Sequence, residues 1–142
     1  MLKKTITYKD YNGKDRTEDH YFNLDEGEIM EMQLSVTGGY SNMIEKVVSA
    51  ENEPDLFKVF KEFVCKTYGE KSDDGKYFLK EDEEGRPLVR KFLQSKAYSA
   101  LMMEFMTDTK AFTKFVNSVI PSDMVEKYNA PAQQNPAAPA AN

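Results

Sequence analysis

The sequence contains very little cysteine and histidine, and this scarcity restricts its chemistry. The single cysteine, Cys65, excludes an internal disulfide and a zinc cluster built on thiolates. The single histidine, His20, excludes a two-histidine metal site and a relay between histidines. A Cys65–His20 dyad is formally open. Because free cysteine usually fills a core, we expect Cys65 to be a small buried helix residue and His20 to lie on a hairpin face.

Positive charge is also in deficit. The chain has 19 lysines and arginines against 24 acids, a net charge of -5. This balance argues against a general nucleic-acid binder and against an anionic membrane surface. No apolar run approaches the length of a bilayer span, and the start, MLKKTITY, has no apolar segment after its lysines. We therefore expect no signal peptide and a reducing, cytoplasmic location.

What the chain does contain fits a folded globule, with 40% hydrophobic and 12% aromatic residues. We predict an α+β fold that is predominantly α. One globular domain would cover residues 1–128, with an N-terminal β-hairpin over 2–23 and a helical body over 24–128. Residues 129–142, rich in alanine, proline and asparagine and without charge, cannot bury enough apolar surface to fold, so we predict a disordered tail or linker there.

The hairpin prediction includes a register. A two-residue loop at Asn12-Gly13 would mix apolar with polar partners across the strands. A three-residue loop, with Gly13 in the left-handed conformation, sets Leu2 opposite Phe22 and places the apolar side chains on one face. We therefore predict the three-residue loop.

About six short amphipathic helices are predicted after the hairpin. The segment that begins at Pro54 has apolar residues around most of its circumference, so we expect it to be the central helix and to end at Gly69. A turn at Asp74-Gly75 should lead to a short strand. The predicted helices cover residues 25–36, 40–50, 53–69, 86–95, 96–106 and 108–120.

Neither a catalytic nor a metal site is expected. The stretch from Glu70 to Glu81 partly matches a twelve-residue calcium loop, with Gly75 at position six. Its first position is glutamate, its ninth is Phe78, and no good exit helix follows. The acidic pairs lie in loops expected to be solvated, where nothing raises a carboxyl pKa. We therefore predict no enzyme and no cofactor.

One small basic cluster stands out in an otherwise scattered distribution of positive charge. We interpret it as the solvated face of an amphipathic helix. Its members are Arg86, Arg90 and Lys91.

Methionine is abundant, with eight residues, and its adaptable side chain suits surfaces that bind partners of varied shape. A stripe of Tyr98, Leu101, Met102 and Phe105 accounts for the core face of one helix, and Met103 falls outside it. One of Met30 and Met32 falls outside the stripe of another helix. These residues could be ordinary core or tolerated surface positions. Our hypothesis is instead an exposed protein-binding surface that includes Met102, Met103, Phe105 and Met106.

Three stretches of the chain, in this order, resemble a known family. They are TITYKDYNGKDRTEDHYFNL, KTYGEKSDDGKYFLK and KAYSALMMEFMTDTKAFTKFVNSVIP. Together they resemble the tail assembly chaperones of long-tailed bacteriophages and prophages of Gram-positive bacteria. The resemblance covers about residues 2–121, and its specificity lies in the order of the stretches. The segment EDEEGRPLVRKFLQS departs from the more acidic, proline-free helix expected there.

The resemblance implies a non-enzymatic role in virion morphogenesis. Such chaperones bind the tape measure protein, keep it soluble, help recruit tail tube subunits, and are absent from the mature virion. In many such phages a ribosomal frameshift adds an extension that contacts the tube protein. The resemblance thus implies that this chain is the short form and that residues 129–142 are the linker. Two alternatives are a structural tail component retained in the virion and an interaction adaptor that uses the hairpin edge, which could also mediate self-association.

Overall fold

The computed structural model describes residues 1–35, 42, 45 and 56–121 of the chain. Within these residues the elements are strands β1 (Leu2–Lys9) and β2 (Asp15–Phe22), helices α1 (Glu26–Ser35) and α3 (Leu56–Thr67), strands β3 (Tyr68–Lys71) and β4 (Phe78–Leu79), and helices α4 (Val89–Leu93), α5 (Lys96–Thr107) and α6 (Thr109–Val119).

The mixed fold class is confirmed, with antiparallel strands at the N-terminus and more helical than extended residues. The described residues contain five helices, against the about six expected. The helix predicted over 40–50 lies almost wholly outside the described residues. The predicted tail over 129–142 also lies outside them.

The N-terminal hairpin has the predicted register. Leu2 pairs with Phe22, and the ladder ends at Lys9 and Asp15. Gly13 has φ 78°, the left-handed conformation that the three-residue loop requires. The alternation of apolar and polar residues therefore predicted the register correctly. Only this register puts the apolar side chains of both strands on the face that packs against the helices.

A strand that the sequence did not indicate follows α3. We expected the helix to continue to Gly69, but the chain turns extended at Tyr68 and pairs with β2, so that the sheet order is β1-β2-β3-β4. A Cβ atom at Gly69 would lie 2.5 Å from the carbonyl oxygen of Leu79 and 2.5 Å from the Phe78 ring. The glycine is thus required by the close approach of β4, not by a helix end.

Phenylalanine dominates the core between the sheet and the helices. Phe60 of α3 lies 4.1 Å from Phe112 of α6, and Phe22 of β2 lies 4.9 Å from Phe115, measured between ring centroids. Phe105 of α5 contacts Phe60, Phe112 and Phe115 at 5.0–5.2 Å. As predicted, the apolar stripe of α6 is buried: Phe112, Phe115, Val116, Val119 and Ile120.

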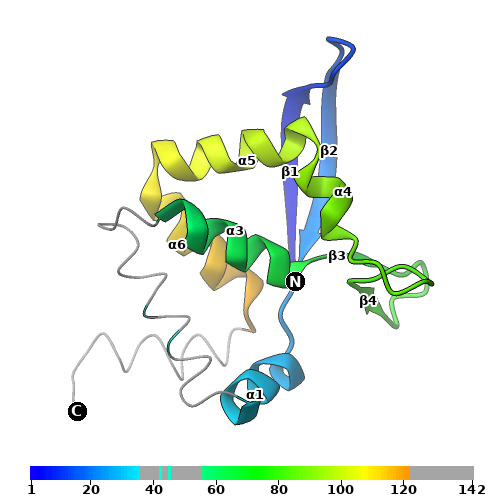
Figure 1. Ribbon diagram of the computed structural model, residues 1–142, viewed down its shortest axis with the longest axis vertical. Helices are drawn as coiled ribbons and strands as arrows, with labels where there is room; N and C mark the ends of the chain where they lie inside the picture. Colours follow the sequence, from blue (N-terminus) through cyan, green and yellow to red (C-terminus); the bar gives the residue numbers. More distant parts are fainter. Residues whose placement is uncertain (36–41, 43–44, 46–55, 122–142) are drawn as a thin grey trace.

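Figure 1 shows how these elements are arranged around the hairpin. Helices α3, α5 and α6 lie together on one side, and the β3–β4 segment projects on the other. Helix α5 packs against β1, and an ion pair of 2.7 Å joins Lys4 to Glu104. Helix α1 is tied to the end of β4 by a short contact between Glu28 and Lys80, with 2.5 Å between the charged atoms.

Candidate protein-binding surface

The four residues predicted to form a protein-binding surface do not share one face of α5. Met103 and Met106 are exposed, with 65% and 50% of their surface accessible. Met102 and Phe105 are buried, at 5% and 0%. The hypothesis therefore needs correction for Met102 and Phe105, which belong to the hydrophobic core in this structure and cannot contact a partner there.

Helical spacing explains this division. Leu101, Met102 and Phe105 follow one another at intervals of one and three residues, which places them on the inward face of α5. Met103 and Met106 are three residues apart, so they lie one turn from each other on the outward face. The prediction that Met103 falls outside the core stripe is thus confirmed.

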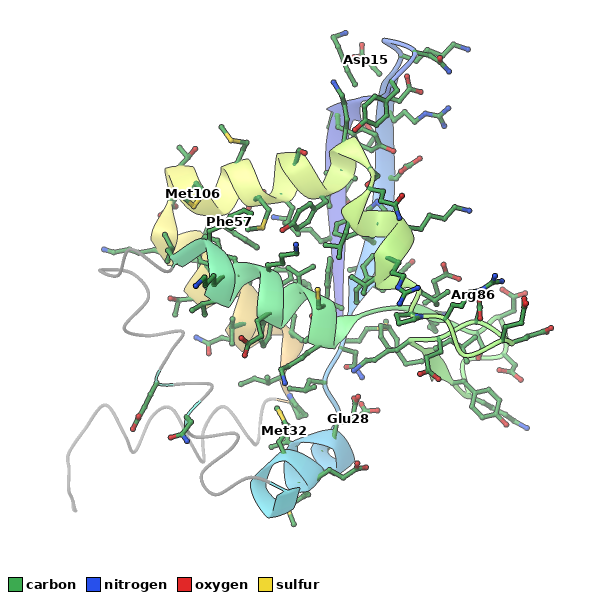
Figure 2. The ribbon with its side chains drawn as sticks, in the orientation of Figure 1. Asp15, Glu28, Met32, Phe57, Arg86 and Met106 are labelled. Atoms are coloured by element: carbon green, nitrogen blue, oxygen red, sulfur yellow. The ribbon has the colours of Figure 1, made fainter. Side chains whose placement is uncertain are left out.

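Phe57 adds a third large apolar side chain near these methionines. It lies in the first turn of α3 and is 48% exposed, although the sequence suggested a helix buried around most of its circumference. Helices α3 and α5 run in opposite directions, and the ring centroids of Phe60 on α3 and Phe105 on α5 are 5.2 Å apart. Phe57 therefore lies level with the C-terminal end of α5, and Figure 2 labels Phe57 and Met106 at this same end of the two helices.

We call Met103, Met106 and Phe57 the methionine surface. Its side chains are flexible or aromatic and offer an apolar contact area without a fixed hydrogen-bonding pattern. Sequence periodicity could not identify Phe57, because the apolar residues of α3 cover too many directions for the stripe alone to say which side faces the core. Only the position of α5 decides that question.

The methionines of α1 divide in the predicted way. Met30 is 52% exposed and Met32 packs against the core with part of its surface covered. Figure 2 places Met32 on α1, well away from Met106. Met30 is therefore an exposed methionine outside the methionine surface, which makes it a useful control.

The exposure of Cys65 contradicts the expectation that this residue fills the core. Cys65 lies on the exposed side of α3. Partial burial raises the pKa of its thiol, an effect that the nearby Lys61 opposes, so the thiolate needed for nucleophilic chemistry is disfavoured. His20 is packed against Tyr68 and Phe92, and its nearest charged group is Glu18. Neither residue has surroundings that suit a nucleophile and its base.

The stretch that partly matched a calcium loop folds as β3, a turn and β4. The Asp74 carboxylate accepts hydrogen bonds from the Ser72 hydroxyl at 2.7 Å and from the Lys76 amide at 3.0 Å, so it stabilises the turn. Among the residues that the structure describes, no group of three or more His, Cys, Asp or Glu side chains is arranged to hold a metal ion. Over the same residues, no helix has the length and apolar character of a membrane span.

These features define an α+β protein whose described residues include exposed large apolar side chains on α3 and α5. A family model described as phage tail assembly chaperone matches residues 1–142. The chain therefore belongs to the phage tail assembly chaperone family, which points to a non-enzymatic protein with partners in tail assembly. Neither a curated protein nor a solved structure matched the chain.

Proposed function

We propose that this protein binds the phage tape measure protein, keeps it soluble during tail assembly and helps recruit tail tube subunits. The observation that supports this proposal is the methionine surface, which exposes large apolar side chains in a protein of an assembly-chaperone family. An apolar patch on an otherwise charged protein is typical of a surface that binds a partner. A long client offers many different apolar segments, and unbranched methionine side chains can adapt to them.

The net charge of -5 fits the same role. A protein that accumulates in many copies on one client needs to stay soluble between binding events, and like charge limits nonspecific association. We further propose that assembly takes place in the cytoplasm of a Gram-positive host and that this chain is the short form. An extended form would reach the tail tube protein through residues 129–142, which lie outside the described part of the chain.

Co-expression with the tape measure protein of the same genome tests the proposal directly. We expect more soluble client than in its absence, and co-purification of the two proteins. The double variant Met103→Asp/Met106→Asp should lose most of this effect, because each change places a charge in the apolar contact. Met30→Asp is the matched control, with the same chemistry at an exposed methionine of α1.

Three outcomes would contradict the proposal in different ways. A folded double variant that still solubilises the client would remove the methionine surface from the role. Insoluble client despite abundant folded chaperone would count against client binding by the short form, and repeating the experiment with the frameshifted extended protein would show whether the extension is needed. Detection of the protein in purified virions by mass spectrometry would favour the structural tail component instead.

A further inference from the structure

A cleft of about 840 Å³ lies on the side of the sheet where α4 packs. Its walls come from β1, β2, β3, the turn over 82–88 and α4. None of the three residues of the methionine surface lines it. The cleft therefore needs its own explanation, separate from binding of the tape measure protein.

Three rings, those of His20, Tyr68 and Phe92, are among the residues that line this cleft. Tyr68 and Phe92 are stacked, with ring centroids 4.6 Å apart and planes inclined by 21°. His20 lies 4.9 Å from Phe92, and its Nδ1 atom is 3.4 Å from the Tyr68 hydroxyl oxygen. Burial, followed by the nearby carboxylates of Glu70 and Glu18, raises the pKa of Tyr68 to about 12. The hydroxyl therefore stays protonated and can donate to Nδ1.

The His20 tautomer that accepts this hydrogen bond carries a donor for which the described residues offer no acceptor. When Nδ1 accepts from Tyr68, the proton of neutral His20 sits on Nε2. Nε2 is buried without a hydrogen-bond partner in the described residues, and the nearest carboxylate oxygen, on Glu18, is 3.6 Å away. Only 14% of the His20 side chain is exposed, so bulk water cannot readily supply the missing partner.

The charges around the rim are not balanced pair by pair. Asp82 is paired with Arg86 at 2.8 Å, and the Glu18 carboxylate accepts a hydrogen bond of 2.6 Å from Tyr8. Arg90 and Lys91 line the cleft from α4, are exposed, and form no ion pair within the described residues. Glu70 of β3 also lines the cleft, and it is the one lining carboxylate whose side chain forms neither an ion pair nor a hydrogen bond within the described residues.

We propose that this cleft is a second protein-docking site, which binds an acidic peptide segment of a partner protein. Arg90 and Lys91 provide the positive charge for its carboxylates, and the partly exposed ring of Tyr68 provides an apolar contact for a neighbouring side chain. A segment that also carries a donor toward Glu70 fits best. Arg86, Arg90 and Lys91 are all exposed, as the sequence predicted, and the proposal adds a recognition role for Arg90 and Lys91.

Titration of the full ¹⁵N-labelled chain with a capped tetrapeptide tests this site. The probe is aspartate–glutamate–phenylalanine–glutamate, and its uncharged counterpart is asparagine–glutamine–phenylalanine–glutamine. We expect saturable chemical-shift changes concentrated at the cleft with the acidic peptide, and at least about tenfold weaker binding of the uncharged one, because several charge pairs are lost together.

Three double variants test whether binding depends on Arg90 and Lys91. Arg90→Glu/Lys91→Glu should weaken binding of the acidic peptide by at least about tenfold, since attraction becomes repulsion. Lys110→Glu/Lys114→Glu is the control: it makes the same change of net charge at exposed positions of α6 that do not line the cleft. Arg90→Gln/Lys91→Gln serves if reversal of charge disturbs the fold, which the dispersion of the remaining resonances reveals.

Three results would overturn the proposal. One is the absence of saturable shifts at the cleft, and another is equal weakening by the α6 control, which would indicate attraction to net charge alone. A third is a dependence of the cleft resonances on protein concentration without peptide, which would assign the cleft to a second copy of the chain. Because the experiment contains no tape measure protein, its failure leaves the methionine surface untouched.

Discussion

The ammonium group of Lys4 lies 2.7 Å from the carboxylate of Glu104, which joins β1 to α5 across one hundred residues of sequence. Glu104 directly follows Met103, so the ion pair helps to hold α5 in the orientation that leaves this methionine exposed. Both charged side chains are partly solvated, at 27% and 44%, and pairs of this kind contribute little stability. The buried residues of α5 must therefore do most to fix its orientation.

Substitutions on α5 test this division between core and surface. We expect Phe105→Ala to lower the free energy of unfolding by about 3–5 kcal/mol, because it leaves a cavity where Phe105 meets three other rings. Met103→Ala should change it by less than about 0.5 kcal/mol. Urea unfolding of both variants measures the difference. Similar losses in the two variants would mean that Met103 is not free for a partner.

The hairpin and the α6 stripe could be predicted from the sequence, since each depends on a local period. The strand at Tyr68 could not, because β2 supplies its partner from about fifty residues away. For the same reason the exposure of Phe57 and Cys65 escaped prediction. The type of an apolar or small residue on a helix does not indicate whether a neighbouring element will cover it.

The close approach of β4 to Gly69 predicts opposite effects for two glycine substitutions. Gly69→Ala should destabilise the protein by about 1–3 kcal/mol, because the new methyl group meets the backbone of Leu79 and the Phe78 ring at 2.5 Å. Gly27→Ala in α1 has open space around it and should be neutral or stabilise by up to about 1 kcal/mol. Thermal or urea unfolding compares the two. A stable Gly69→Ala variant would show that β4 can move away from β3.

His20 predicts a loss of stability in mild acid. Burial lowers its pKa below the ordinary 6.5, while the carboxylate of Glu18 opposes this shift more weakly. The unfolded chain therefore takes up a proton at a higher pH than the folded protein does. The stability that the neutral ring contributes is complete above 6.5 and is lost as the pH falls through the lowered pKa of the folded state.

Unfolding in urea between about pH 7.5 and pH 5 measures this loss. His20→Phe is the matched variant, because it keeps an aromatic ring against Phe92 but cannot titrate. Its stability should depend less on pH than that of the unmodified chain over this range. Identical pH profiles would show that His20 does not govern the acid response.

One carboxylate accepts three hydrogen bonds in the turn that precedes α4, in addition to the backbone bonds of the turn. Asp82 accepts hydrogen bonds from the amides of Glu84 and Arg86, both at 2.9 Å, and from the Arg86 guanidinium at 2.8 Å. The amide of Arg86, then its side chain, holds the pKa of Asp82 below the ordinary 3.8. Asp10 occupies the matching position in the first hairpin turn, and its pKa is lowered chiefly by Arg16.

We predict that the Asp82 carboxyl titrates below 3.8 in NMR spectra of the folded protein. Because the folded pKa is the lower one, its contribution to stability is present above 3.8 and is lost as the pH falls through the folded value. Asp82→Ala should speed hydrogen exchange at the amides of Glu84 and Arg86, which lose their acceptor. Asp73→Ala, at an exposed aspartate of the other turn, should leave both rates unchanged. Unchanged exchange in Asp82→Ala would show that the backbone hydrogen bonds hold this turn without the carboxylate. The wall that the turn contributes to the cleft would then not depend on Asp82 either.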